Sequence, residues 1–131
     1  MAQGDSVVVL NQQMLHKELN TPQGDLWRWL DKKGGKALNG AQRQVGVNTG
    51  RLIKSLHMRH LGDPLGQSLW IGSNTVRYGY MHHEGTRPHV IAPKAGSVLK
   101  MRSGRIVHGP VRHPGTKPNR FLSSQLHHFR Y

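Results

Sequence analysis

The sequence predicts an α+β fold: a long N-terminal helix packed on an antiparallel β-sheet, a protruding β-hairpin and a short C-terminal helix. Three observations predict it. Apolar residues recur at helical spacing over residues 22–45. Two short β-prone segments flank a Gly-Asp-Pro turn within residues 55–72. Residues 97–109 place a Ser-Gly pair between two β-prone runs, a pattern typical of a hairpin.

Length and composition predict how the chain is organised. A chain of 131 residues is expected to form a single domain over residues 1–131. Hydrophobic residues make up only 35% of it, and 16 glycines and 7 prolines favour loops and extended arms. We therefore expect a modest core that partners help to stabilise. Residues 1–20 are expected to form an N-terminal arm, and residues 90–112 a hairpin excursion.

The N-terminal part contains a candidate strand and two candidate helices. Residues 6–10 are expected either to begin an edge strand or to pack as part of an arm. Residues 11–20 can form a short helix with its apolar residues on one side. The pair that follows predicts the start of the long helix, with Thr21 as its N-cap and Pro22 at its first position.

The long helix is expected to run from about Pro22 to Val45. Glycines interrupt it, and a kink near Gly34 and Gly35 is compatible with the pattern. Gly46 predicts the end of the helix, because glycine readily takes the left-handed conformation that stops a helix.

The middle of the chain is predicted to be mostly strand. Thr49 can cap a short turn over residues 50–55. Residues 55–61 alternate as a half-buried strand does, residues 62–64 form a turn, and residues 68–72 are expected as a short buried strand.

The last third of the chain is predicted to hold the hairpin and the final helix. Residues 78–86 fit a strand and a helical turn equally well. Residues 97–109 are expected to form the hairpin, with residues 103–104 near its tip. Asn119 is expected to cap a final helix, whose apolar residues recur at helical spacing.

Charge is the strongest compositional signal. Lys and Arg number 19 against 6 Asp and Glu, so the net charge is +13. Glu84 is the last acidic residue, and residues 85–131 hold nine bases. Such a surface attracts nucleic-acid phosphates or an acidic partner. The candidate residues that face DNA or a partner are Arg87, Lys94, Lys100, Arg102, Arg105, Arg112, Lys117 and Arg120.

Several functional classes receive no support from the sequence. There is no zinc-finger spacing, no basic heptad repeat and no strand motif with stacked aromatics, so reading of specific bases is not expected. No apolar run approaches the length of a membrane span, and the N-terminus lacks the pattern of a secretory signal, so no membrane partner is expected. The chain has no cysteine, which excludes disulfides and suits a reducing cytosol.

One short phrase occurs twice, as HEGTRPH at residues 83–89 and as HPGTKPN at residues 113–119. In each copy glycine allows a positive φ, the threonine hydroxyl can bond neighbouring backbone groups, and proline extends the residue before it. We expect a matched pair of turns that anchors the base of one excursion. The predicted structural turn residues are Gly50, Gly85, Thr86, Pro88, Gly115, Thr116 and Pro118.

The histidines of the two phrases do not predict a metal site or a catalytic site. Neither has the HExxH spacing of a zinc protease, and a closed metal site needs three or four defined ligands. The six acids share no close spacing, and neither GxSxG nor GxxxxGK[ST] is present. We therefore expect no enzyme activity, no catalytic residue, no metal and no cofactor. A metal-independent histidine mechanism stays open, although no single histidine stands out.

The order of four segments resembles the head–tail connector family of long-tailed bacteriophages, the tail-completion or neck proteins. The segments are VNTGRLIKSL (47–56), WIGS (70–73), VRYGYMHHEGTRPHVI (76–91) and HPGTKPNRFL (113–122). Family members carry a Thr-Gly-Arg/Ala-Leu segment, a Tyr-Ala-x-x-x-Glu-x-Gly-Thr segment and a Pro-x-x-Phe-Leu segment. The resemblance spans about residues 21–122 and is strongest to the branch found in phages of actinobacteria. Gly79 stands where the family usually has alanine.

The resemblance implies a structural ring and no catalysis. Such proteins assemble, usually as hexamers, in the virion neck between the portal complex and the tail tube, and the genome passes through the lumen. The implied partners are other copies of the chain, head-completion or stopper proteins, tail tube or terminator proteins, and genomic DNA. The implied location is the head–tail junction of the virion, after assembly in the host cytoplasm. Residues 97–109 are the expected contact between subunits or rings.

Two alternatives remain open. Tail terminators, which cap the tail tube, have a similar size and architecture, so the resemblance does not separate them from connectors. A small basic nucleic-acid-binding protein is a third hypothesis, which rests on the net charge alone.

Overall fold

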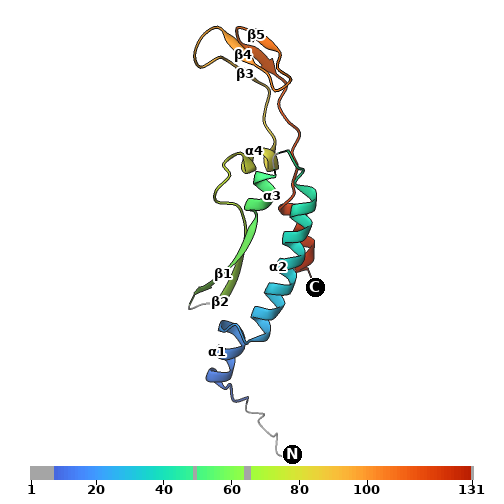
Figure 1. Cartoon of the computed structure of the whole chain (residues 1–131). Helices are drawn as coiled ribbons and strands as arrows, with labels where there is room; N and C mark the ends of the chain where they lie inside the picture. The colour runs from blue at the N-terminus through green and yellow to red at the C-terminus, as the bar shows by residue number, and fades with distance from the viewer. Residues whose placement is uncertain (1–7, 49, 64–65, 131) are drawn as a thin grey trace, which may run out of the picture.

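The longest element, helix α2, runs along an elongated molecule, with one short helix at its N-terminal end and a β-rich arm beyond its C-terminal end (Figure 1). This computed structural model describes residues 8–48, 50–63 and 66–130. Its six strands form three two-stranded antiparallel sheets, which pair β1 with β2, β3 with β6 and β4 with β5. The elements are α1 (Gln12–Asn20), α2 (Asp25–Gln44), α3 (Arg51–Ser55), β1 (His57–Asp63), β2 (Gly66–Gly72), α4 (Tyr78–Glu84), β3 (His89–Ile91), β4 (Val98–Lys100), β5 (Ile106–His108), β6 (Val111–His113) and the 3₁₀ helix η1 (Ser123–Phe129).

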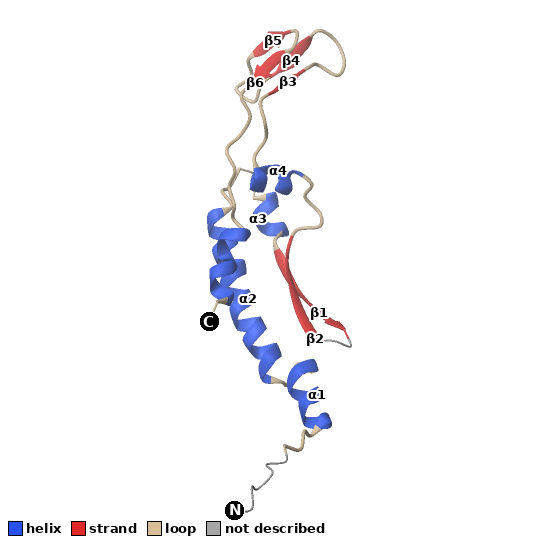
Figure 2. Ribbon diagram, turned by 180° about the vertical axis from the view of Figure 1, so that it is seen from behind, coloured by secondary structure: helices blue, strands red, loops and turns tan. Residues whose placement is uncertain are grey.

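The predicted α+β class is confirmed. A long N-terminal helix, small antiparallel sheets with a β-hairpin and a short C-terminal 3₁₀ helix make up the fold. Helix α2 lies beside the β1–β2 sheet, and the other two sheets form the arm (Figure 2). We call residues 89–113 the distal arm.

The predicted start of the long helix is wrong by one short turn. Thr21 ends α1 instead of capping α2, because its hydroxyl donates a hydrogen bond to the Lys17 carbonyl at 2.6 Å. Gly24 donates its N–H to the Thr21 carbonyl at 3.0 Å, so Pro22 lies in a turn and α2 begins at Asp25. The short helix predicted over residues 11–20 is confirmed, and Asn11 caps it by accepting from the Met14 N–H at 3.1 Å. Residues 8–10 form no strand, and residues 6–7 of the predicted edge strand lie outside the described residues.

Helix α2 continues without interruption through Gly34 and Gly35. A Cβ on Gly34 would lie only 2.2 Å from Cδ2 of Leu69, so this glycine lets the helix approach the β1–β2 sheet closely. The predicted stop at Gly46 is confirmed, since Gly46 has a φ of +73° directly after the helix.

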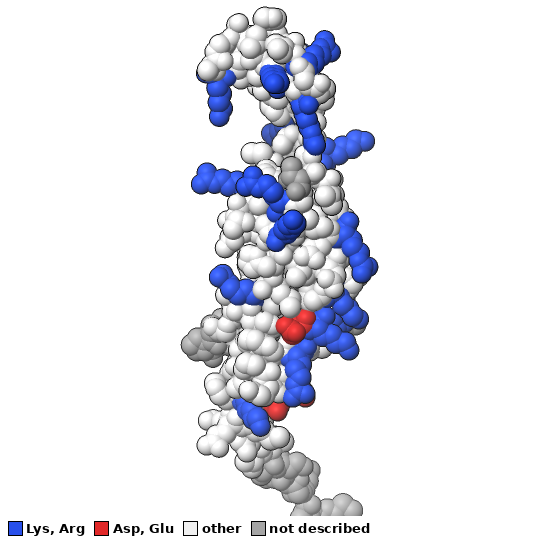
Figure 3. Space-filling model, viewed as in Figure 1, with Lys and Arg blue, Asp and Glu red and all other residues white. Residues whose placement is uncertain are grey.

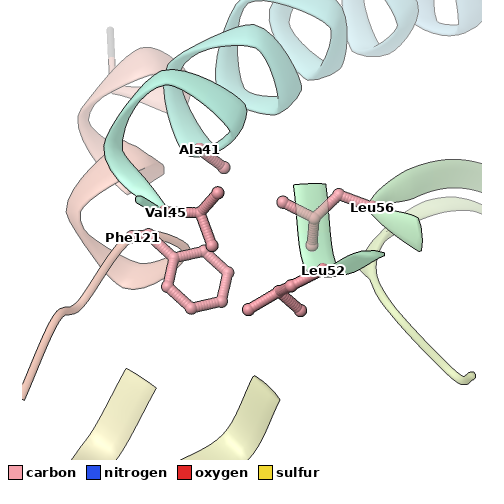
Figure 4. Packing of buried hydrophobic residues seen from close by; sticks show 5 residues of the cluster. All are labelled: Ala41, Val45, Leu52, Leu56 and Phe121. Atoms are coloured by element: carbon pink, nitrogen blue, oxygen red, sulfur yellow. The ribbon is translucent and has the colours of Figure 1, made fainter. Parts of the chain in front are cut away.

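The core is small and lies where α2, α3 and the C-terminal segment meet. Its buried residues are Ala41, Val45, Leu52, Leu56 and Phe121. Figure 4 shows the Phe121 ring beside Val45, with the two leucines of the α3 region across from them. The modest core expected from the composition is therefore confirmed.

The β1–β2 hairpin differs in its boundaries from the prediction. Ser55 ends α3, so β1 begins at His57 and continues to Asp63, which pairs with Gly66. The predicted turn at residues 62–64 is therefore wrong for Gly62 and Asp63, which belong to β1. Its third residue, Pro64, lies outside the described residues, as does the predicted cap Thr49. Strand β2 is longer than predicted and half-buried, with only Gly72 buried, because one side of it has no covering element.

The distal arm contains more structure than the sequence predicts. The expected hairpin over residues 97–109 is confirmed as β4 and β5, and its tip closes where Met101 donates to the Arg105 carbonyl at 2.8 Å. A second ladder, β3 with β6, was not predicted, because three-residue strands carry too little pattern. Of the ambiguous residues 78–86, Tyr78–Glu84 form helix α4, which Gly85 ends. Thr86 instead forms an isolated β-bridge with Thr116.

The C-terminal helix is a 3₁₀ helix that Asn119 does not cap. Asn119 instead donates its side-chain N–H to the Gln44 carbonyl at 2.9 Å, so it satisfies the end of α2. The predicted role of Asn119 is wrong because a carbonyl left free at the end of a neighbouring helix competes for the same side chain.

Candidate functional site

The two copies of the repeated phrase lie against each other at the base of the distal arm. Thr86 and Thr116 each donate their backbone N–H to the carbonyl of the other, both at 3.1 Å. Their hydroxyl oxygens also lie 3.1 Å apart. These contacts join residues thirty positions apart and close the arm into a loop. We call the two facing segments, residues 85–88 and 115–118, the arm clamp.

The glycines of the arm clamp fit into each other's copy. Gly85 and Gly115 have φ values of +75° and +87°. A Cβ on Gly85 would lie 2.5 Å from the Thr116 carbonyl oxygen, and a Cβ on Gly115 would lie 2.2 Å from that of Thr86. No other residue type meets both the left-handed conformation and the close approach.

The remaining predicted turn residues divide between the arm clamp and the body. Pro118 passes beside Gly85, and Pro88 passes beside Gly115, since a Cβ on either glycine would lie within about 3 Å of the proline nitrogen, at 2.8 and 3.1 Å. Gly50 lies elsewhere, as the residue before α3, with a φ of +74°.

The histidines near the arm clamp bond to backbone and neighbouring side chains. His82 Nε2 donates to the Val45 carbonyl at the end of α2. His83 Nδ1 donates to the Glu84 carboxylate at 2.7 Å, and its Nε2 accepts from the Ser123 N–H at 3.3 Å. His113 Nδ1 accepts from the Gly115 N–H at 3.0 Å. Within the described part of the chain, no three His, Asp or Glu side chains group closely enough to hold a metal ion.

All eight candidate basic residues are exposed, but they do not form one compact patch. They extend from the arm clamp along the distal arm, and Arg102 at the hairpin tip donates to Asn48 of the body. Arg120 lies 3.5 Å from the Glu84 carboxylate, which offsets part of its charge. On the face in Figure 3, Lys and Arg occur along the whole length, while Asp and Glu are visible only in the half away from the arm.

His128 lies in η1 beside other positive groups. Its pKa is lowered from the ordinary value, first by desolvation and then by the charges of His127, Lys36 and Lys33. Both causes disfavour the protonated form of the ring.

An apolar groove runs between β2 and the C-terminal segment, and the sequence did not predict it. It consists of two adjoining hollows of about 430 and 290 Å³, both lined by Trp70, Ile71, His83 and Leu122. We call it the β2 groove. Leu126 lines it and is 63% exposed. The helical stripe that contains Leu126 was visible in the sequence, but the docking of η1 that leaves this residue uncovered was not.

None of the helices in the described part of the chain has the length and apolar character that a membrane span needs.

No protein-family model, curated protein or solved structure matches the chain.

Proposed function

We propose that this chain is a structural subunit of the neck of a long-tailed bacteriophage. Copies of it form a ring, of six subunits in the arrangement that the resemblance implies, that joins the DNA-filled head to the tail and lets the genome pass. The function is geometric and involves no catalysis: the body builds the ring, and the distal arm contacts the next subunit or ring.

The accessible surface is the observation that carries the proposal. It measures 10760 Å², whereas a compact monomer of 14.7 kDa exposes about 6,900 Å². The eleven residues outside the described ranges do not account for the difference, because even fully extended they expose about 1,800 Å². A standard interface hides about 800 Å² on each partner, so the excess suits a subunit with neighbours on several sides.

The resembling segments form the joint between the body and the arm. Leu52 of the first segment and Phe121 of the last lie in the core, while Thr86 of the third closes the arm clamp. A family pattern that consists of joint residues supports a shared architecture, in which the joint sets how the arm is presented to neighbouring subunits.

The charge distribution supports a surface along which DNA passes. The distal arm carries bases and no acid, and nothing among the described residues suggests base reading. Such a surface binds phosphates through charge alone. An acidic ring of partner proteins would be recognised by the same charges.

Removal of the gene from the phage tests the proposal. We expect DNA-filled heads and tails of normal length that fail to join, counted by electron microscopy. Complete, infectious particles without the gene product would overturn the proposal.

A tail terminator is the second candidate. It also forms a ring, so the large accessible surface of the chain favours it equally. The gene removal separates the two functions, because loss of a terminator yields overlong tails. A small nucleic-acid-binding protein is the third candidate, favoured by the net charge of +13. It predicts strong binding of the isolated chain to free DNA or RNA, with a salt slope of several units.

A further inference from the structure

One edge of strand β2 is open to a partner. Strand β2 pairs with β1 on one side, and among the described residues no strand pairs with its other side. An unpaired edge leaves a row of backbone N–H and C=O groups available to another strand.

The β2 groove lies along this edge. Leu69, Trp70 and Ile71 all line the larger hollow. Successive residues of a strand point to opposite faces, so three in a row can line one hollow only where it follows the strand's edge. No residue of β1 lines either hollow, which places the groove on the side of β2 away from β1.

The opposite wall of the groove is apolar and belongs to the C-terminal segment. Leu122, Leu126 and Phe129 line it, and Ala37 of α2 forms part of the floor. A strand added to β2 would therefore place alternate side chains on an apolar wall while its backbone pairs with the edge, as in recognition by β-strand addition.

The chain itself contains a segment that can pair as such a strand. Val8, Val9 and Leu10 are 82%, 86% and 69% exposed, and valine favours strands. Three residues span about 10 Å, the same length as the three β2 residues that line the groove. The described residues before α1 lead away from the body, at the end opposite the distal arm (Figure 1).

Charge favours this segment over the distal arm as the occupant. Residues 1–16 contain Asp5 and no Lys or Arg, whereas the whole chain carries +13. Copies of so basic a chain repel one another, and a segment with one acid and no base is the part that approaches a neighbour at least electrostatic cost.

We propose that residues around Val8–Leu10 of one subunit add as a third strand to the free edge of β2 in a neighbouring copy and fill its β2 groove. This inference rests on the proposed function, in that the ring supplies the neighbouring copy. It assigns to the N-terminal arm the contact that links successive subunits.

Cross-linking between single-cysteine chains tests the inference, because the natural chain has no cysteine. A tagged chain with Val9→Cys is mixed with an untagged chain with Leu126→Cys and treated with a short bismaleimide. Leu126 is mostly exposed, so its replacement leaves the fold intact. The control pairs Val9→Cys with Arg43→Cys, an exposed residue of α2 that does not line the β2 groove. We expect a mixed cross-linked dimer in at least tenfold higher yield for Leu126 than for the control.

The outcomes separate this inference from the proposed function. Equal yields for the two pairs, in protein that forms oligomers, would overturn the inference and leave the ring standing. Cross-linking confined within one chain, in a dilute double variant carrying both Val9→Cys and Leu126→Cys, would also overturn it. Protein that forms no oligomer and is absent from virions would overturn the ring and the inference together.

A charge variant provides a second readout. Val8→Asp with Val9→Asp is expected to weaken association between subunits at least tenfold, because the groove wall is apolar. The matched control, Gln12→Asp with Gln13→Asp, adds the same charge in the first turn of α1, where acids are favourable. Equal association of both variants, measured by sedimentation, would contradict the proposed strand addition.

Discussion

Single residues decide how the distal arm is held. In the arm clamp, two glycines with positive φ each lie against the carbonyl of the opposite threonine, and the N–H, carbonyl and hydroxyl groups of Thr86 and Thr116 face one another. The histidines that draw attention in the sequence bond to backbone and side chains nearby. The informative residues of the repeated phrase are therefore glycine and threonine, which hold geometry.

Gly115→Ala is expected to open the arm clamp. The substitution costs about 1–2 kcal/mol for the left-handed backbone and more for the contact with the Thr86 carbonyl. Amide exchange of Thr86 and Thr116, measured by NMR, should become at least tenfold faster. The control is Gly96→Ala, where φ is +79° but a Cβ would meet nothing within 4 Å. Equal effects of the two variants would show that the close approach contributes nothing.

Asn119→Ala is expected to destabilise the body by about 1 kcal/mol, because the Gln44 carbonyl at the end of α2 loses its donor. Asn119→Asp should cost more, since it places a negative charge at a helix C-terminus. The midpoint of urea unfolding measures both. Asn39→Ala, at an exposed position of the same helix, serves as the control and should leave the midpoint nearly unchanged.

At the scale of elements, the sequence predicts whether a segment is a helix or a strand better than it predicts where that segment begins and ends. The long helix, both hairpins and the stop at Gly46 follow from local pattern and glycine conformation. Thr21 and Asn119 were misassigned because each side chain had a nearer free carbonyl, at the end of α1 and of α2. The repeat indicated that two turns belong together, whereas the β2 groove depends on how η1 docks, which local pattern does not encode.

Neutralising the distal arm is expected to weaken DNA binding selectively. Replacing Lys94, Lys100, Arg105 and Arg112 by glutamine should reduce the log–log salt slope of duplex DNA binding by about 3 to 4 units. Fluorescence anisotropy of the assembled protein provides the measurement. The control neutralises four exposed bases of the helical body: Lys17, Lys32, Lys36 and Arg43. The same loss of slope in both variants would contradict a specific role for the arm.

At the scale of the whole molecule, the elongated shape leaves many large apolar side chains exposed. The six buried hydrophobic residues among those described are few for a chain of this length, and Tyr80, Leu126 and the valines before α1 are largely exposed. Association with other chains would bury these side chains and stabilise the fold. In the proposed function, the neighbouring subunits of the ring are these partners.

Stability is therefore expected to depend on protein concentration. If only the folded form associates, the Tm should rise by several degrees between dilute and concentrated protein. Calorimetry at matched scan rates measures this rise. A constant Tm, together with a monomeric mass at the highest concentration by sedimentation, would contradict stabilisation by neighbouring copies.

In the proposed function, copies of this chain form a ring at the head–tail junction. Cryo-electron microscopy of the neck of the phage that encodes the chain tests it most directly. We expect a closed ring of this fold between the portal and the tail tube, with α2 and the distal arm recognisable in each subunit. A neck map at side-chain resolution in which every density is assigned to other proteins would contradict it.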